Sequence, residues 1–142
     1  MNIDQIITIL KKTSLFRDMS DSFLYALAFS AEMTSFSTGD ILIKSSEKDI
    51  KALIIIDGRA FVQKKANPIE LKRGSIIGML ALINNQSMKD PVIAGSKGNA
   101  LILDRDLFDK LTTQFDYFPK QLINYIQSHL DDQIEELSQI IN

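Results

Sequence analysis

Short apolar segments separated by turn residues fill the middle of the chain, and this pattern limits the fold classes that the chain can adopt. Glycine and proline interrupt the segments too often for helices of ordinary length. The expected strands are 33–36, 41–44, 52–57, 59–64, 69–71, 92–94 and 100–103. Many short strands of this kind are typical of a double-sheet jelly roll. We expect a hairpin turn at Gly58 and a jelly-roll core made of Phe36, Leu53, Ile55, Val62, Ile77, Leu101 and Leu103.

Helical patterns flank this β region on both sides. Residues 3–12 carry one apolar stripe, and Ser20 is a good N-cap for a second helix. After the strands, Asp104 is placed to cap a helix that extends to about residue 113. Pro119 fits the first turn of a last helix that we expect to reach residue 141. The sequence thus predicts one domain over 1–142, with N-terminal helices at 1–32, a jelly roll at 33–103 and C-terminal helices at 104–142.

The stretch from Gly74 to Ile83 has the backbone of a phosphate-binding turn without its charges. Gly74 and Gly78 bracket a short apolar run, and a helix-compatible Met-Leu-Ala-Leu follows at once. A glycine at a strand-to-helix junction lets the main chain approach a ligand closely, and the amides of the new helical turn face an anion. Gly78, Leu80 and Ala81 are therefore candidate ligand-binding residues.

This stretch resembles the phosphate-binding cassette of the cyclic-nucleotide-binding domain family, of the cAMP-receptor and kinase-regulatory-subunit type. The family pattern there reads Phe-Gly-Glu-Leu-Ala-Leu, followed by a short turn, an Arg and small residues. Four further segments match the family in the correct order, namely Leu15-Phe16 with Ser20, 36–42, 52–62 and 100–108. The resemblance covers roughly residues 13 to 115 and implies a mainly β fold with flanking helices, a cyclic-nucleotide-binding-like jelly roll with a long C-terminal helix.

The resemblance also implies a ligand site, and the chain departs from it at the charged positions. Met79 stands where the family has the Glu that binds the ribose hydroxyl. Met88 stands where it has the Arg that grips the cyclic phosphate, and a slip of one residue puts Lys89 there instead. Asp90 falls where a small neutral residue is usual. The upstream Gly-Asp-x-Gly loop of the family is replaced by residues 46–49, Ser-Glu-Lys-Asp.

Two interpretations of this degenerate cassette remain open. In the first, the pocket binds cAMP and cGMP weakly or not at all, because two charge-assisted contacts are missing. Each such contact is worth about 1.5–3 kcal/mol. In the second, Lys89 or backbone amides replace the Arg, and the protein is a working sensor of a cyclic nucleotide or another small anion. The simplest structural interpretation is that Gly78 closes a tight turn and Met79 fills an apolar space.

Composition argues against catalysis, metal binding and direct nucleic-acid binding. The chain has no cysteine and one histidine, His129, in the expected last helix, so neither a nucleophile–base pair nor a metal-ligand cluster is indicated. We expect no cofactor and no metal. The net charge is -2, although Lys64-Lys65 and Lys72-Arg73 form small basic pairs at a hairpin. The apolar runs are too short for a signal peptide or a membrane span, and the default expectation is a cytoplasmic protein.

The last helix suggests how the protein assembles. Its apolar residues recur at spacings of three and four, which predicts a homodimer interface made of Leu122, Ile126, Leu130, Ile134 and Leu137. The leading functional prediction is a non-enzymatic regulatory or interaction module with a degenerate nucleotide pocket and an unidentified protein partner. A nucleotide or small-anion sensor is the first alternative. The second is part of a transcription regulator that lacks its DNA-binding domain.

Overall fold

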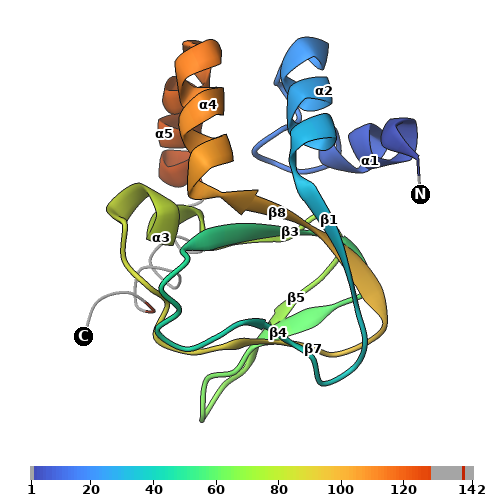
Figure 1. Cartoon of the computed structure of the whole chain (residues 1–142), viewed down its shortest axis with the longest axis vertical. Coiled ribbons are helices and arrows are strands. Elements are labelled where there is room, and N and C mark those ends of the chain that lie inside the picture. The colour runs from blue at the N-terminus through green and yellow to red at the C-terminus, as the bar shows by residue number, and fades with distance from the viewer. Residues whose placement is uncertain (1, 129–138, 140–142) are drawn as a thin grey trace.

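Strands form the body of the molecule and helices cover one side of it (Figure 1). The computed structural model describes residues 2–128 and 139. The N-terminal helices are α1 (Ile3–Leu10) and α2 (Asp21–Ser30). The strands are β1 (Glu32–Phe36), β2 (Ile41–Ile43), β3 (Lys51–Asp57), β4 (Ala60–Val62), β5 (Ile69–Leu71), β6 (Ile76–Ile77), β7 (Val92–Ala94) and β8 (Gly98–Asp104). The remaining helices are α3 (Met79–Asn84), α4 (Arg105–Gln114) and α5 (Tyr117–Ser128).

Two four-stranded antiparallel sheets make the jelly roll. One has the strand order β1-β8-β3-β6 and the other β2-β7-β4-β5. In the first sheet β8 lies between β1 and β3, with Leu101 opposite Met33 on one side and Ile54 on the other. The predicted fold class, mainly β with flanking helices, is confirmed. The β6 strand was not predicted, because it is two residues long and lies inside the stretch that the cassette pattern accounted for.

The first sheet separates two apolar cores. The barrel core, between the sheets, contains Phe36, Leu53, Ile55, Val62 and Ile77, as predicted. The helical core, between that sheet and the helices, contains Leu101 and Leu103 together with Ile54 and Ile56. The prediction for Leu101 and Leu103 was therefore wrong about the side of the sheet. Neighbouring residues of a strand face opposite ways, so on β8 it is Ala100 that enters the barrel core.

The predicted helix starts are confirmed at two positions. The Ser20 hydroxyl oxygen accepts a hydrogen bond from the Phe23 amide at 3.2 Å, and the Asp104 carboxylate accepts one from the Leu107 amide at 2.8 Å. Pro119 lies in the first turn of α5, as expected. The predicted extension of this helix to residue 141 includes residues 129–138 and 140–141, which lie outside the described residues.

Aromatic contacts fix α5 against the N-terminal helices. The ring of Phe118 lies 4.7 Å from that of Phe23, centroid to centroid, and the ring of Phe115 lies 5.1 Å from it. Phe23 and Phe118 have no exposed surface. Since such pairs add about 0.5–1.5 kcal/mol each beyond their burial, they hold α2 against the start of α5 in the helical layer.

Candidate functional site

Gly78 forms the corner where β6 turns into α3. Its φ is +98°, in the left-handed region, and it is the N-cap of the helix. A Cβ atom built on Gly78 would lie 2.5 Å from the Lys51 carbonyl oxygen and 3.0 Å from the Ala52 Cα. Both neighbours are backbone atoms of β3, so the corner tolerates no side chain. The close approach of main chain that the sequence suggested is thus made to β3.

The candidate ligand residues after Gly78 face two different cores. Met79 is 3% exposed and belongs to the helical core, whereas Ala81 is 1% exposed and belongs to the barrel core. A helix turns by about 100° per residue, so positions two apart point in nearly opposite directions. Leu80 lies between them and is also buried. Met79 thus packs against helices rather than lining the interior of the jelly roll.

Met88 fills the interior of the jelly roll at the position where the resemblance implied an arginine. It is 3% exposed and belongs to the barrel core. The cavity that remains beside Met88, Ala81 and Ile43 has a volume of about 10 Å³. That is room for about one water molecule, whereas small-molecule pockets usually measure about 300–1,000 Å³. The Lys89 side chain is exposed at the surface.

The loop between β2 and β3 is joined by hydrogen bonds to the loop between α3 and β7, residues 85–91, which we call the cassette loop. The Ser46 amide donates to the Met88 carbonyl oxygen at 2.9 Å, and the Ser45 hydroxyl donates to the Lys89 carbonyl oxygen at 2.6 Å. The Ser87 hydroxyl donates to the Glu47 carbonyl oxygen at 2.6 Å. Ser46 adopts a φ of +55° although it is not a glycine. Together these contacts hold the loop against the mouth of the small cavity.

An acidic side chain lines this cavity. One Glu47 carboxylate oxygen lies 3.6 Å from the Lys51 ammonium nitrogen. The other carboxylate oxygen is buried and has no hydrogen-bond partner among the described residues. Asp49 also lines the cavity. Lys51 lines the cavity as well, so Glu47 and Asp49 leave its lining with one excess negative charge, which disfavours an anion in this space.

Gln139 contacts the cassette loop from the C-terminal end of the chain. The Lys89 amide donates to the Gln139 carbonyl oxygen at 2.6 Å, and the Asp90 amide donates to the Gln139 side-chain oxygen at 3.0 Å. Gln139 is 1% exposed. Sequence reasoning missed this contact, because its partners are about fifty residues apart and no local pattern connects them.

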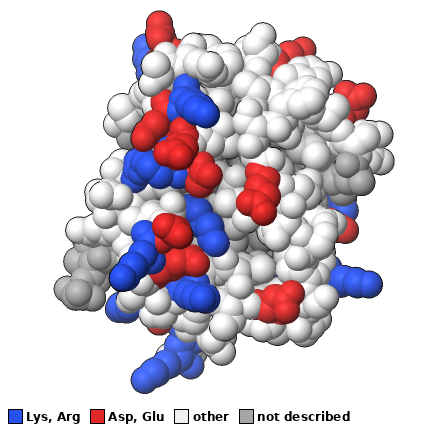
Figure 2. Space-filling model, in the orientation of Figure 1, with Lys and Arg blue, Asp and Glu red and all other residues white. Residues whose placement is uncertain are grey.

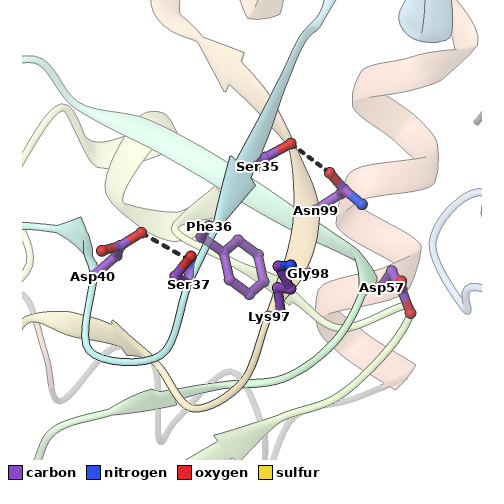
Figure 3. A pocket seen from close by; sticks show the side chains of 8 residues that line it. All are labelled: Ser35, Phe36, Ser37, Asp40, Asp57, Lys97, Gly98 and Asn99. Atoms are coloured by element: carbon purple, nitrogen blue, oxygen red, sulfur yellow. Dashed lines mark hydrogen bonds between the residues drawn. The ribbon is translucent and has the colours of Figure 1, made fainter.

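A second hollow, of about 340 Å³, lies where β1 ends and β8 begins (Figure 3). Four of its polar side chains, of Ser35, Asp40, Asp57 and Asn99, are engaged with their neighbours. Asp40 accepts from the Ser37 amide at 2.8 Å, and the Ser35 hydroxyl donates to the Asn99 side-chain oxygen at 2.8 Å. Asp57 is paired with an arginine outside the hollow. The sequence predicted no ligand site here.

Charges of both signs are interleaved on the surface (Figure 2). At the predicted basic hairpin, Arg73 lies 3.2 Å from Asp57, and Glu70 lies 3.8 Å from Arg59 and 3.9 Å from Lys72. These two acids pair with three of the basic side chains there. Across residues 2–128 and 139, no group of three or more potential metal ligands is found. No helix in that part of the chain is long and apolar enough to cross a membrane. His129 lies outside it.

Comparisons with known proteins connect this architecture to nucleotide-regulated kinases. No family model matches the chain. The chain is 28% identical over 118 residues to cGMP-dependent protein kinase, isozyme 1, of Drosophila melanogaster. It is 27% identical over 124 residues to the cGMP-dependent protein kinase egl-4 of Caenorhabditis briggsae. The alignments cover 77% and 82% of this chain but only 15% and 17% of the two kinases.

Solved structures match over most of the chain. PKAR CBD2 bound to Sp-2Cl-cAMPS superposes with a TM-score of 0.70 at 26% identity, covering 88% of this chain and 87% of that one. A regulatory subunit of a cAMP-independent protein kinase A from Trypanosoma brucei, solved as a triple mutant with cAMP in the A site, gives a TM-score of 0.69. That match has 24% identity and covers 77% of this chain and 41% of the other.

Proposed function

We propose, on the premise that this chain has the fold of a cyclic-nucleotide-binding domain, that it is a non-enzymatic regulatory module whose nucleotide pocket is closed. The observation that carries the proposal is the cavity of about 10 Å³ beside Met88. The similar proteins with known roles are regulatory nucleotide-binding domains and kinases that contain them, which supports regulation rather than catalysis. In this proposal residues 1–142 act as one cytoplasmic unit on a protein partner, without cofactor, metal or direct contact to nucleic acid.

Three features support a closed pocket. Met79 packs in the helical core, where it makes no contribution to a ribose site. Met88 occupies interior space and carries no charge for a phosphate. Glu47 and Asp49 add negative charge to the lining of the remaining cavity. An anionic nucleotide would therefore need both space and positive charge that the cassette lacks.

Titration calorimetry with cAMP and cGMP tests this proposal. We expect the full chain to give no saturable heat below about 1 mM of either nucleotide. The loss of two charge-assisted contacts costs about 3–6 kcal/mol, and each 1.4 kcal/mol is about a factor of ten in affinity. Lys89→Ala should change nothing. Micromolar binding to the wild type that disappears in Lys89→Ala would overturn the proposal and establish a working sensor.

We further propose that the module is a homodimer joined through its C-terminal segment. Helix α5 supports this, because Ile123 is 55% exposed and Tyr117 is 37% exposed. The predicted interface residue Ile126 is half-buried, whereas Leu122 packs inside the helical core of its own chain. The other predicted residues, Leu130, Ile134 and Leu137, lie outside the described residues. Each apolar side chain that is buried contributes about 1.5–3 kcal/mol, offset by the entropy of association.

Light scattering at tens of micromolar protein tests the dimer. We expect a mass twice the 16.0 kDa of one chain. Leu130→Asp should return the protein to the single-chain mass, because a charge would enter the apolar stripe. Phe29→Asp is the matched control, since Phe29 is 76% exposed on α2 and should not affect assembly. A wild-type protein of single-chain mass at this concentration would rule out the dimer.

A further inference from the structure

We propose that Gln139 is a built-in occupant of the cassette loop, a latch that must leave before an oxyanion can take its place. This inference rests on the proposed function and names the residue that keeps the site shut. Two consecutive backbone amides, of Lys89 and Asp90, both donate to oxygens of Gln139, at 2.6 and 3.0 Å. Adjacent amides that converge in this way form a concave binding place for oxygen ligands.

The two amides are held in place before any ligand arrives. On the other side of the same loop, the carbonyl oxygens of Met88 and Lys89 accept hydrogen bonds from Ser46 and Ser45. Because these carbonyls belong to the same two peptide groups as the amides of Lys89 and Asp90, their bonds fix the directions in which the amides point. Because the two amides are fixed, they favour a group whose two acceptor oxygens match the spacing of the amides.

The oxygens of Gln139 suit this position chemically, although its side-chain nitrogen is buried without a hydrogen-bond partner among the described residues. Gln139 supplies two acceptor oxygens, one from the backbone and one from the side chain, and it brings no negative charge. Asp90 is half-buried beside the loop, and its carboxylate would oppose a charged occupant. Gln139 is 1% exposed, so water does not compete for these hydrogen bonds. The neutral occupant thereby satisfies two amides that an oxyanion would otherwise use.

Gln139 and an oxyanion at these amides exclude each other. A phosphate or carboxylate group that binds there must displace Gln139, and release of Gln139 must make such binding easier. Thermodynamic linkage requires the two effects to be equal in magnitude. Occupancy of the cassette loop by an oxyanion is therefore coupled to the release of Gln139.

Amide hydrogen exchange, followed by NMR on the full chain, tests the latch. In the wild type the Asp90 amide should be protected. Gln139→Ala should speed its exchange at least about fivefold, as expected when a hydrogen bond is lost and a segment opens locally. Gln127→Ala is the matched control, because Gln127 is an exposed glutamine of α5. Unchanged exchange in Gln139→Ala, or the same acceleration in Gln127→Ala, would overturn the latch.

Titration with inorganic phosphate, followed at the Lys89 and Asp90 amides, tests the exclusion. Gln139→Ala should respond at a phosphate concentration at least about fivefold lower than the wild type. Equal midpoints in the two proteins would overturn the exclusion. The same samples titrated with cAMP keep the two proposals separate. Micromolar cAMP binding to the wild type contradicts the closed pocket, whereas the exchange rates judge the latch whatever cAMP does.

Discussion

Replacing Met79 with glutamate, the residue that the family has in its cassette, is expected to lower the free energy of unfolding by about 3–4 kcal/mol at pH 7. Met79 is 3% exposed in the helical core. Full burial raises the pKa of a carboxyl by about 3–5, to above 7, so at pH 7 the loss is about 1.36 kcal/mol for each pH unit above the unfolded pKa of about 4.3. A loss of this size is a large part of the total stability of many small domains, about 5–15 kcal/mol. Urea unfolding measures it.

The pH dependence identifies the cause of this loss. Burial raises the folded-state pKa of the introduced carboxyl above its unfolded value of about 4.3. The electrostatic part of the loss in unfolding free energy is therefore absent below about pH 4.3, and it grows as the pH rises toward the folded-state pKa. Met79→Gln has a similar shape without a titrating group, so its deficit should not follow pH in this way. If Met79→Glu and Met79→Gln are equally stable at pH 7, the side chain at this position reaches water, and its assignment to the helical core is wrong.

Gly78→Ala is expected to lower the free energy of unfolding by about 2–5 kcal/mol. About 1–2 kcal/mol comes from placing a side chain at a positive φ. A further 1–3 kcal/mol, about the cost of overpacking, comes from the contact of the new Cβ with the Lys51 carbonyl oxygen at 2.5 Å. Since that oxygen belongs to the central strand β3, the corner and the strand must both shift. The measurement is again urea unfolding.

Gly39→Ala separates the two contributions. Gly39 has a φ of +92°, close to that of Gly78, but a Cβ there meets no atom within 4 Å. Its loss should be about 1–2 kcal/mol, from the backbone conformation alone. Equal losses at Gly39 and Gly78 would mean that the approach to β3 adds nothing and that the corner is held in shape by conformation only.

The fold was predictable where local signals were strong. Gly58 adopts a φ of +80° in the hairpin between β3 and β4, and Ser20 and Asp104 cap the helices they were expected to cap. These signals depend on a residue and its near neighbours. The side of a sheet that a strand residue faces depends instead on which face the helices cover. Leu101 and Leu103 are apolar in either case, so the sequence could not distinguish the two cores.

The candidate site was harder to predict than the fold. The pattern located the Gly78 turn and the missing charges, but not the orientation of Met79, since a methionine suits an apolar core as well as a vacant ligand position. The contact of Gln139 with Lys89 and Asp90 joins distant parts of the chain through backbone amides. Any residue except proline has such an amide, so the contact has no signature in the sequence.

The burial of strand β3 on both faces makes this protein prone to aggregate when the strand is exposed. Its residues 52–56, Ala-Leu-Ile-Ile-Ile, are all buried, because one side faces the barrel core and the other faces the helical core. Because neither face of this strand meets water, its sequence is uncharged and rich in β-branched isoleucine. Segments of this kind stack into intermolecular β-structure when unfolding exposes them. Lys51 and Asp57, at the two ends of β3, are the nearest charges that oppose such stacking. The segment that unites the two cores of the folded molecule is therefore also the one that most needs to be covered early, as the chain leaves the ribosome.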